Sequence, residues 1–384
     1  MDISDKNMKK ICIVAGEESG EKYGAMLVRA LRDRILDAEF SGMGGDEMRS
    51  AGVHLINEIG KLTVVGFFEV LSNFGAVYKA FGRLKEHIKR DRPDLLILID
   101  FPDFNIRLAQ YAGTQGVKIL YFISPQVWAW RKKRVRTIAR LVDKMIVIFP
   151  FEADFYKRHG IEAHFVGHPL MDMITVRNDK KEMRRKLGVP DGYRFIGLLP
   201  GSRNSEVGRI LPVLLRAARL LCQTHEKLRF VLPVAQNIER RLVDRLAGQF
   251  HDLDLIISHD DYYDIMNALD LAIVASGTAT VELALLGKPM VVVYRLNALT
   301  YLLAKQLVKI EHVAMVNLIA GKKIVPELIQ GDCNAREICS QAGSFLDDDA
   351  KMAEAVSELS AIRDKLGEKG MFRKAADIIG AMLV

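Results

Sequence analysis

The chain has 384 residues, of which 49% are hydrophobic and 27% are charged, with four cysteines and a formal net charge of +7. This length favours two domains, because a single hydrophobic core rarely extends beyond about 250–300 residues, and the apolar content excludes a disordered chain. The cysteines are scattered without C-x-x-C spacing, which disfavours a zinc ribbon or a disulfide scaffold and favours a reducing compartment.

Apolar runs of strand length alternate with longer segments of helical period along the chain. In the N-terminal half the predicted strands are Ile11–Ala15, Asp94–Asp100, Val117–Ile123 and Lys144–Phe149. In the C-terminal half they are Arg194–Leu199, Leu228–Val234, Asp254–Ser258, Asp270–Ala275 and Pro289–Tyr294. Runs this rich in Val, Ile and Leu indicate parallel strands buried on both faces. The pattern restarts near residue 190, after a charged stretch (Arg177–Lys186) that predicts a linker or a surface helix. We therefore expect an α/β protein of two doubly wound parallel-sheet domains with a ligand site in the crevice between them.

The first predicted strand is followed by a glycine-containing turn, Gly16-Glu17-Glu18-Ser19-Gly20, and then by a helix. Glycines at such a turn let a ligand approach the backbone amides at the start of the helix. The spacing differs from G-x-G-x-x-G, and the carboxylates of this turn would repel a dinucleotide pyrophosphate. A Rossmann oxidoreductase is therefore disfavoured, whereas a sugar acceptor with free hydroxyls is compatible with the turn.

Two aspartates, Asp100 and Asp103, follow the next predicted strand. They lie at the carboxyl end of that strand, where open α/β sheets carry their active-site groups. An aspartate in this place is able to act as a general base, which is the interpretation that we favour for Asp100. For Asp103 we favour a structural role, as the N-cap of a helix that starts near Asn105.

Two turns in the second half have the composition of a phosphate site. Gly201, Ser202 and Arg203 follow one predicted strand, and an arginine is suited to paired hydrogen bonds with a diphosphate. Ser276, Gly277 and Thr278 follow another strand at the start of a helix, whose free amides and dipole favour an anion. Glu282 lies one helical turn further on, where a carboxylate is placed to accept both ribose hydroxyls. Together these turns predict a nucleoside diphosphate as substrate or leaving group.

An aromatic segment, residues 62–84, departs from the strand–helix alternation. It contains Val65, Phe67, Phe68, Phe74 and Phe81, and basic residues follow at once; a second basic cluster, Arg131–Arg140, follows Trp128 and Trp130. Aromatic side chains beside Lys and Arg suit a surface that faces anionic lipid. The alternative is that the phenylalanines belong to the core and the charges to a solvated face. Nucleic acid is disfavoured, since no nucleic-acid-binding motif accompanies the charges.

The remaining polar residues predict neither a metal centre nor a nucleophile. The histidines lack metal-ligand spacing, no Ser-His-Asp arrangement or P-loop is recognisable, and the acidic runs at 260–261 and 347–349 each precede a helix that they would cap. The N-terminus lacks the basic start of a signal peptide, and no window approaches the roughly 18–20 apolar residues of a transmembrane helix. We therefore expect a cytoplasmic protein without metal or other cofactor.

These motifs, in this order, resemble lipid-A-disaccharide synthase, an inverting glycosyltransferase of the GT-B type. The resemblance covers almost the whole chain. The matching segments are Ala15–Gly20, Gly42–Gly45, Ile99–Asn105, Ser124–Arg131, Phe149–Glu152, Val166–Pro169, Leu199–Arg203, Ala275–Thr278 with Glu282, Asn317–Gly321 and Val325–Leu328. One departure is Glu21, where the family usually has aspartate, so we assign Glu21 no close catalytic role.

The resemblance implies a specific reaction. UDP-2,3-diacylglucosamine would donate its sugar to the 6-hydroxyl of 2,3-diacylglucosamine 1-phosphate, giving a β-1,6-linked disaccharide 1-phosphate and UDP with inversion and without metal. Asp100 would be the base, and the acceptor loop would be Gly16, Glu17, Ser19 and Gly20. The UDP donor would be held by Gly201, Ser202, Arg203, Ser276, Gly277, Thr278, Glu282 and Asn317, the last on the motif match alone.

The resemblance also implies an organisation and a location. Residues 1–175 would form an acceptor-binding Rossmann-like domain with a membrane-facing segment at 62–84. Residues 190–364 would form the UDP-donor-binding domain across a central cleft, and a helix within 365–384 would return to the first domain. The enzyme would sit peripherally on the cytoplasmic face of the inner membrane as a homodimer.

Three alternatives remain open at this point. Two are other UDP-sugar enzymes of the same architecture: a hydrolysing UDP-GlcNAc epimerase, or a GlcNAc transferase of the peptidoglycan type. Neither needs the aromatic segment with its basic flank. The third is a non-catalytic, membrane-associated sensor of nucleotide sugars, which would bind UDP but give no release of UDP in the presence of both lipids.

Overall fold

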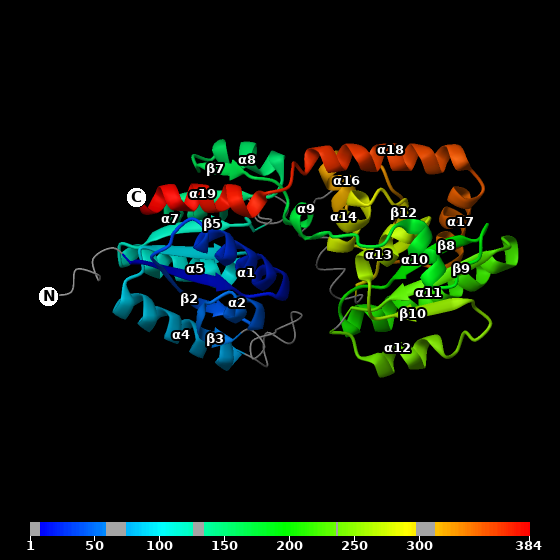
Figure 1. The fold of residues 1–384 in the computed structure, drawn as a ribbon, viewed down its shortest axis with the longest axis horizontal. Helices are drawn as coiled ribbons and strands as arrows, with labels where there is room; N and C mark the ends of the chain where they lie inside the picture. Colours follow the sequence, from blue (N-terminus) through cyan, green and yellow to red (C-terminus); the bar gives the residue numbers. More distant parts are fainter. Residues whose placement is uncertain (1–7, 59–73, 126–133, 236, 297–311) are drawn as a thin grey trace. The chain divides into compact units, whose positions relative to one another are not determined.

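A computed structural model describes residues 8–58, 74–125, 134–235, 237–296 and 312–384. The chain divides into two units, the first made of Met1–Asp172 with Leu366–Val384 and the second of Met173–Lys365. Each unit is an α/β layer structure around one parallel sheet with its own hydrophobic core (Figure 1).

Unit 1 contains a seven-stranded sheet in the order β3-β2-β1-β4-β5-β6-β7. Its strands are β1 (Lys9–Ala15), β2 (Ala38–Gly44), β3 (His54–Glu58), β4 (Leu95–Ile99), β5 (Lys118–Phe122), β6 (Lys144–Val147) and β7 (Ala163–Phe165). Its helices are α1 (Glu18–Arg32), α2 (Asp46–Ser50), α4 (Phe74–Asp91), α5 (Pro102–Thr114), α7 (Val135–Leu141), α8 (Pro150–Lys157) and α19 (Met371–Leu383), with α9 (Pro169–Met173) at the end of the unit's first segment. Helix α1 packs against α2 and α19, whereas α4, α5 and α7 pack side by side on the other face.

The C-terminal helix α19 belongs to unit 1 although α18 before it belongs to unit 2. Figure 1 shows it in red among the blue and cyan elements of unit 1. Its apolar face, which includes Phe372 and Ile379, is part of the unit 1 core, and Lys118 Nζ donates to the carbonyl of Met382 at 2.6 Å. The spacing of the apolar residues therefore gives α19 one buried face. Through this face α19 packs into unit 1, whose first segment ends at Asp172.

Unit 2 repeats the same strand order over six strands, β10-β9-β8-β11-β12-β13. They are β8 (Arg194–Leu199), β9 (Leu228–Pro233), β10 (Leu255–Ser258), β11 (Leu271–Ala275), β12 (Met290–Tyr294) and β13 (Glu327–Ile329). The helices are α10 (Lys180–Lys186), α11 (Asn204–Thr224), α12 (Arg240–Ala247), α13 (Tyr262–Ala268), α14 (Thr278–Leu285), α16 (Met315–Ala320), α17 (Ala335–Leu346) and α18 (Asp349–Lys365). In both units the direction of winding reverses at the middle of the sheet, between β1 and β4 and between β8 and β11, and ligands of open α/β sheets bind at such points.

All nine strands predicted from apolar runs are present, and the doubly wound α/β class is confirmed. Four further strands, β2, β3, β7 and β13, were not predicted. Three of these lie at sheet edges, where apolar runs are not required. The fourth, β2, contains Gly42, which interrupts the apolar run. Gly42 has a φ of +146°, and a Cβ atom at this position would lie 1.9 Å from the carbonyl oxygen of Ile13. Only glycine fits this close approach.

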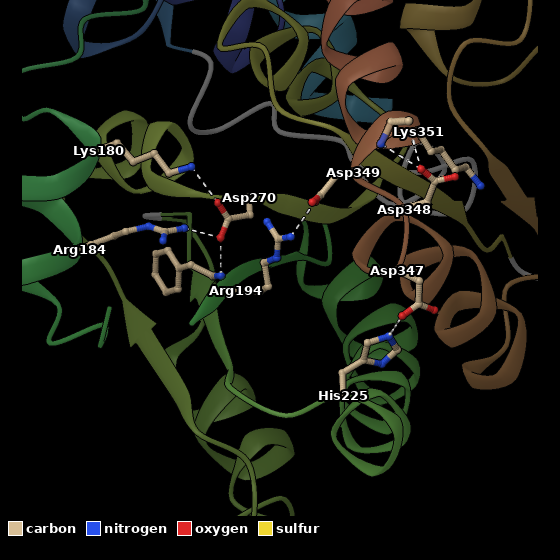
Figure 2. Close-up of polar contacts among 11 residues, drawn as sticks. Lys180, Arg184, Arg194, His225, Asp270, Asp347, Asp348, Asp349 and Lys351 are labelled. Atoms are coloured by element: carbon tan, nitrogen blue, oxygen red, sulfur yellow. Dashed lines mark hydrogen bonds and ion pairs between the residues drawn. The ribbon is translucent and has the colours of Figure 1, made fainter. Parts of the chain in front are cut away.

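Most of the charged stretch 177–186 forms helix α10, which begins at Lys180 and which ion pairs connect to the sheet of unit 2 (Figure 2). The Asp270 carboxylate, which directly precedes β11, accepts hydrogen bonds from Lys180 Nζ at 2.7 Å and the Phe195 amide at 2.8 Å, and it pairs with Arg184. Burial raises the pKa of Asp270, but these hydrogen bonds outweigh it and hold the pKa below its usual value. The stretch is thus an integral helix of the unit and not a linker.

The acidic run at 347–349 has three different roles, of which only one is the predicted cap (Figure 2). Asp348 caps α18 by accepting from the amides of Ala350 and Lys351. Asp347 pairs with His225 at 3.0 Å, and Asp349 pairs with Arg194 at 2.9 Å. Capping therefore explains Asp348, whereas its two neighbours join α17 and α18 to the rest of unit 2.

Candidate active site

The two turns at the winding reversal of unit 1 lie next to each other. Strands β1 and β4 are paired in parallel, with Ala15 opposite Ile99, so the turns after them start at the same edge of the sheet. The Phe101 ring lies against Gly16, where a Cβ would come within 2.2 Å of it. Glu17 and Ser19 are exposed at this edge, Gly16 is half-buried and Gly20 is buried beneath them. Gly16 is therefore required for the contact that joins the glycine-containing turn after β1 to the aspartate turn after β4.

Asp100 and Phe101 both have a left-handed backbone, each with a φ of +45°. Two consecutive residues other than glycine in this region are strained, and such strain collects at functional sites. Side-chain hydrogen bonds hold the turn: Asn105 Nδ2 donates to the carbonyl of Asp100 at 2.8 Å, and the Tyr121 hydroxyl donates to the same oxygen at 2.6 Å. These two hydrogen bonds fix the backbone of Asp100 at the end of the buried strand β4.

The surroundings of Asp100 suit a general base at neutral pH. Burial raises the pKa of Asp100 to about 7, the negative charge of Glu17 adds to this rise, and a hydrogen bond from the Phe101 amide opposes it. A base is most effective when its pKa lies near the working pH. Asp100 therefore has the environment that an acid–base residue requires.

The neighbouring carboxylates have structural partners. Helix α5 begins at Pro102, so Asp103 lies in its first turn instead of capping it, and Asp103 pairs with Arg134. The Glu21 carboxylate accepts from the Glu47 amide at 2.9 Å, at the start of α2. The predicted N-cap role of Asp103 is wrong, and Glu21 links α1 to α2.

The two turns at the winding reversal of unit 2 also share one edge. Strands β8 and β11 pair in parallel with Leu199 opposite Val274. Ser202 and Arg203 are exposed, and Gly201 has a φ of +120° that permits its tight turn. Gly277 and Thr278 are exposed at the start of α14, and Ser276 Oγ donates to the carbonyl of Val313 at 3.0 Å. An arginine, several backbone amides and a helix N-terminus thus lie at the same edge of one sheet, and groups of these kinds bind anions.

Glu282 lies in α14 with its carboxylate largely buried. Its two oxygens accept from the hydroxyls of Tyr262 at 3.1 Å and Tyr263 at 3.2 Å. Burial and the charge of Glu282 raise the pKa of Tyr262 well above its usual value, so the hydroxyl stays protonated and donates. The two tyrosines, which the sequence did not single out, orient this carboxylate.

The side chain of Asn317, which the motif match assigned to the nucleotide, has four hydrogen bonds within unit 2. Its side chain is fully buried, and Nδ2 donates to the Val325 carbonyl at 3.0 Å and to the Glu327 carboxylate at 2.6 Å. Its Oδ1 accepts from the amides of Ile324 at 2.8 Å and Val325 at 3.0 Å. All four hydrogen-bonding positions of the amide are used. Glu327 in turn accepts from the Val313 amide, so this network holds the segment to which Ser276 is bonded.

The aromatic segment lies mostly outside the described residues, which include neither Val65, Phe67 and Phe68 nor the side chain of Phe74. Phe81 is half-buried and packs edge-on against Phe104, with ring centroids 5.4 Å apart. Phe81 thus packs against the unit 1 core, in line with the alternative interpretation. Tyr78 on the same helix is 73% exposed.

A Ser-His-Asp alignment that the sequence did not reveal lies inside unit 1. Ser41 Oγ is 2.7 Å from His87 Nε2, and His87 Nδ1 is 2.6 Å from Asp91 Oδ2. Ser41 lies within β2, away from the edge that carries Asp100, and burial lowers the pKa of His87. The alignment joins α4 to the sheet. Among the described residues, no group of three or more His, Cys, Asp or Glu is arranged to hold a metal ion.

Comparisons with known proteins place this chain in a family. A family model described as lipid-A-disaccharide synthetase matches residues 11–379. The chain is 42% identical over 376 residues to the lipid-A-disaccharide synthase of Geobacter metallireducens, covering 98% of this chain and 97% of that protein. The chain belongs to the lipid-A-disaccharide synthase family. It is thus a glycosyltransferase of lipid A biosynthesis that uses a UDP-sugar, and the family predicted from the motifs is confirmed.

Solved structures with little sequence identity share the fold of this lipid-A-disaccharide synthase family member. The glycosyltransferase of kitacinnamycin has a TM-score of 0.68 at 14% identity, covering 98% of this chain and all of that one. The Staphylococcus aureus MnaA–UDP structure has a TM-score of 0.65 at 16% identity, covering 98% of this chain and 97% of that one. These similarities confirm the GT-B fold. In the described part of the chain, no helix is long and apolar enough to cross a membrane.

Proposed function

We propose that this glycosyltransferase transfers the sugar of UDP-2,3-diacylglucosamine to the 6-hydroxyl of 2,3-diacylglucosamine 1-phosphate, with inversion. The observation that carries the proposal is Asp100, a carboxylate with a pKa near 7 on a strained turn at the carboxyl edge of a sheet. In the mechanism, Asp100 takes the proton of the acceptor hydroxyl while that oxygen attacks the anomeric carbon from the face opposite UDP. One displacement of this kind inverts the anomeric centre and gives the β-linked disaccharide 1-phosphate.

The donor nucleotide is assigned to unit 2. Arg203, the amides of Gly201 and Ser202 and the start of α14 would take the diphosphate and stabilise the charge that grows on the leaving UDP. Glu282, oriented by Tyr262 and Tyr263, would accept the ribose hydroxyls. Asn317 would support this site through Glu327 without touching the ligand. In this assignment the leaving group is stabilised by protein charges, without a metal or other cofactor.

The acceptor is assigned to unit 1, within residues 1–175, and the donor to residues 190–364. Gly16, Glu17, Ser19 and Gly20 would face the acceptor sugar beside Asp100. Both proposed substrates carry acyl chains, so we also propose that the enzyme works peripherally on the cytoplasmic face of the inner membrane, as a homodimer. The composition of the exposed residues of α4 supports this location, because they include Tyr78 together with Lys79, Arg83 and Arg90.

The reaction is tested by measuring UDP release from the two acylated substrates, with product identification by mass and NMR. We expect release that depends on the acceptor, a β-1,6 linkage in the product, and activity that survives removal of divalent metal by EDTA. UDP-GlcNAc without acyl chains serves as the matched control. Efficient turnover of that control in place of the lipid would favour an epimerase or a soluble-sugar transferase, and binding of UDP without release from either donor would contradict the proposed reaction.

A further inference from the structure

A carboxylate lies directly over the turn that we assign to the donor's diphosphate. Glu206, in the first turn of α11, has Oε2 3.2 Å from the Ser202 amide and Oε1 3.4 Å from Arg203 Nη1. The same Oε2 lies 2.5 Å from the point where a Cβ on Gly201 would be. The side chain therefore folds back over the glycine and receives a hydrogen bond from the backbone amide of this turn.

The contacts of Glu206 are those expected for an anionic ligand. One partner is a backbone amide and the other is a guanidinium group that is 53% exposed, which are the two donor types that phosphate oxygens use. The hydroxyl of Tyr294, at the end of β12 two strands away in the sheet, is influenced by both charges: burial and Glu206 raise its pKa, whereas Arg203 lowers it. Glu206 itself is only 25% exposed. It is thus a carboxylate in the place where a diphosphate is expected.

We propose that the Glu206 carboxylate acts as an internal substitute for the diphosphate: it occupies the Gly201–Arg203 turn while the nucleotide is absent and is displaced when a nucleoside diphosphate binds. This inference rests on the proposed function, since it requires that the donor's diphosphate binds at this turn. The displaced carboxylate then competes with the bound nucleotide for the same donors. Glu206 thereby weakens the binding of UDP and speeds its release after transfer.

A purely structural role predicts a different result. Glu206 is an acidic residue in the first turn of a helix, where it stabilises the free amides and the helix dipole. If that were its whole role, Glu206→Gln would leave nucleotide affinity unchanged, and if Glu206 positioned Arg203 for the phosphate, the same substitution would weaken binding. Glutamine keeps an amide oxygen that accepts from Ser202 but removes the competing charge.

The experiment is calorimetric titration of UDP and of uridine into wild type, Glu206→Gln, Glu206→Ala and Glu226→Gln. Glu226 is exposed just beyond the other end of α11 and controls for the change in net charge. We expect UDP to bind about fivefold more tightly to both Glu206 variants, the upper end of the effect of one solvent-exposed charge pair. Uridine affinity should not change, and Glu226→Gln should match wild type. In steady-state assays the donor KM and the inhibition constant of UDP should both fall, and kcat should fall with them because UDP leaves more slowly.

The outcomes separate this inference from the proposed function. Wild type that fails to bind UDP would overturn the donor site and this inference together. Wild type that binds UDP, with equal or weaker binding to both Glu206 variants, would overturn the inference alone. Tighter binding of uridine as well as UDP would also contradict it, because the effect would then not act through the phosphates.

Discussion

Replacing Asp100 by asparagine should abolish activity and stabilise the protein at the same time. Asparagine is close in shape and tolerates the left-handed backbone of this position. A pKa of about 7 for Asp100, compared with about 4 in an unfolded chain, corresponds to about 4 kcal/mol. Because the folded state holds this proton more tightly, the penalty grows as the pH rises from about 4 to about 7 and is constant above that range. The asparagine variant carries no such penalty.

The prediction is measured by urea unfolding of wild type and Asp100→Asn across this pH range. The variant should gain little near pH 4 and up to about 4 kcal/mol near pH 8. Its kcat should fall at least about a hundredfold, the usual effect of losing a general base. In the wild type, kcat/KM should rise with pH through about 7, where Asp100 loses its proton. Taking the difference between the two proteins cancels the other titrating groups.

The matched control is Asp103→Asn, which removes the same charge three residues away. Asp103 is 70% exposed and pairs with Arg134, so its removal should change stability by no more than about 1 kcal/mol at any pH. The reasoning is refuted if Asp100→Asn is no more stable than wild type near pH 8. It is also refuted if the variant keeps most of its activity.

Three further predictions follow from buried contacts. Gly16→Ala should cost about 1–3 kcal/mol, because the new Cβ meets the Phe101 ring, and thermal melting checks it. Asn317→Ala should lower the unfolding free energy by about 3 kcal/mol through four lost hydrogen bonds; weaker UDP binding at unchanged stability would instead indicate direct contact. Burial lowers the pKa of His168 to about 3, so protonation of the unfolded state should cost wild type about 2 kcal/mol between pH 7 and pH 5. Denaturant titrations should show that His168→Asn removes this loss, and an unchanged pH dependence would contradict the assignment.

The sequence predicted those parts of the fold that depend on continuous apolar burial. Eight of the nine strands found from apolar runs lie inside their sheets and the ninth, β10, lies at an edge, whereas the other edge strands, β3, β7 and β13, carry little apolar signal. Position at the carboxyl ends of strands also sufficed to find the four turns, because parallel strands bring those ends to one edge. Pattern alone thus located the turns at which we propose that the chemistry takes place in each unit.

The partners of the site residues were beyond prediction because they come from distant segments. Tyr121 and Asn105 hold the Asp100 turn, and Tyr262 and Tyr263 hold Glu282, through contacts that no local spacing reveals. Asn317 was assigned to the nucleotide on its motif alone, and its saturated amide became evident only with the fold. Glu206 had a weak local signal, since an acid three residues after an N-cap position often reaches back to the turn.

The two proposed half-sites have opposite electrostatic requirements, which is a physical reason for placing them on separate sheets. A carboxylate base near neutral pH needs burial and negative neighbours, and Asp100 has both, with Glu17 beside it. A diphosphate needs Arg203 and free amides, and that positive charge would lower the pKa of a base placed among them. Glu206 is the exception, a carboxylate held at the proposed diphosphate turn. Its presence there is expected if the turn must release UDP as well as bind it, because a site that only attracted anions would hold its product too tightly.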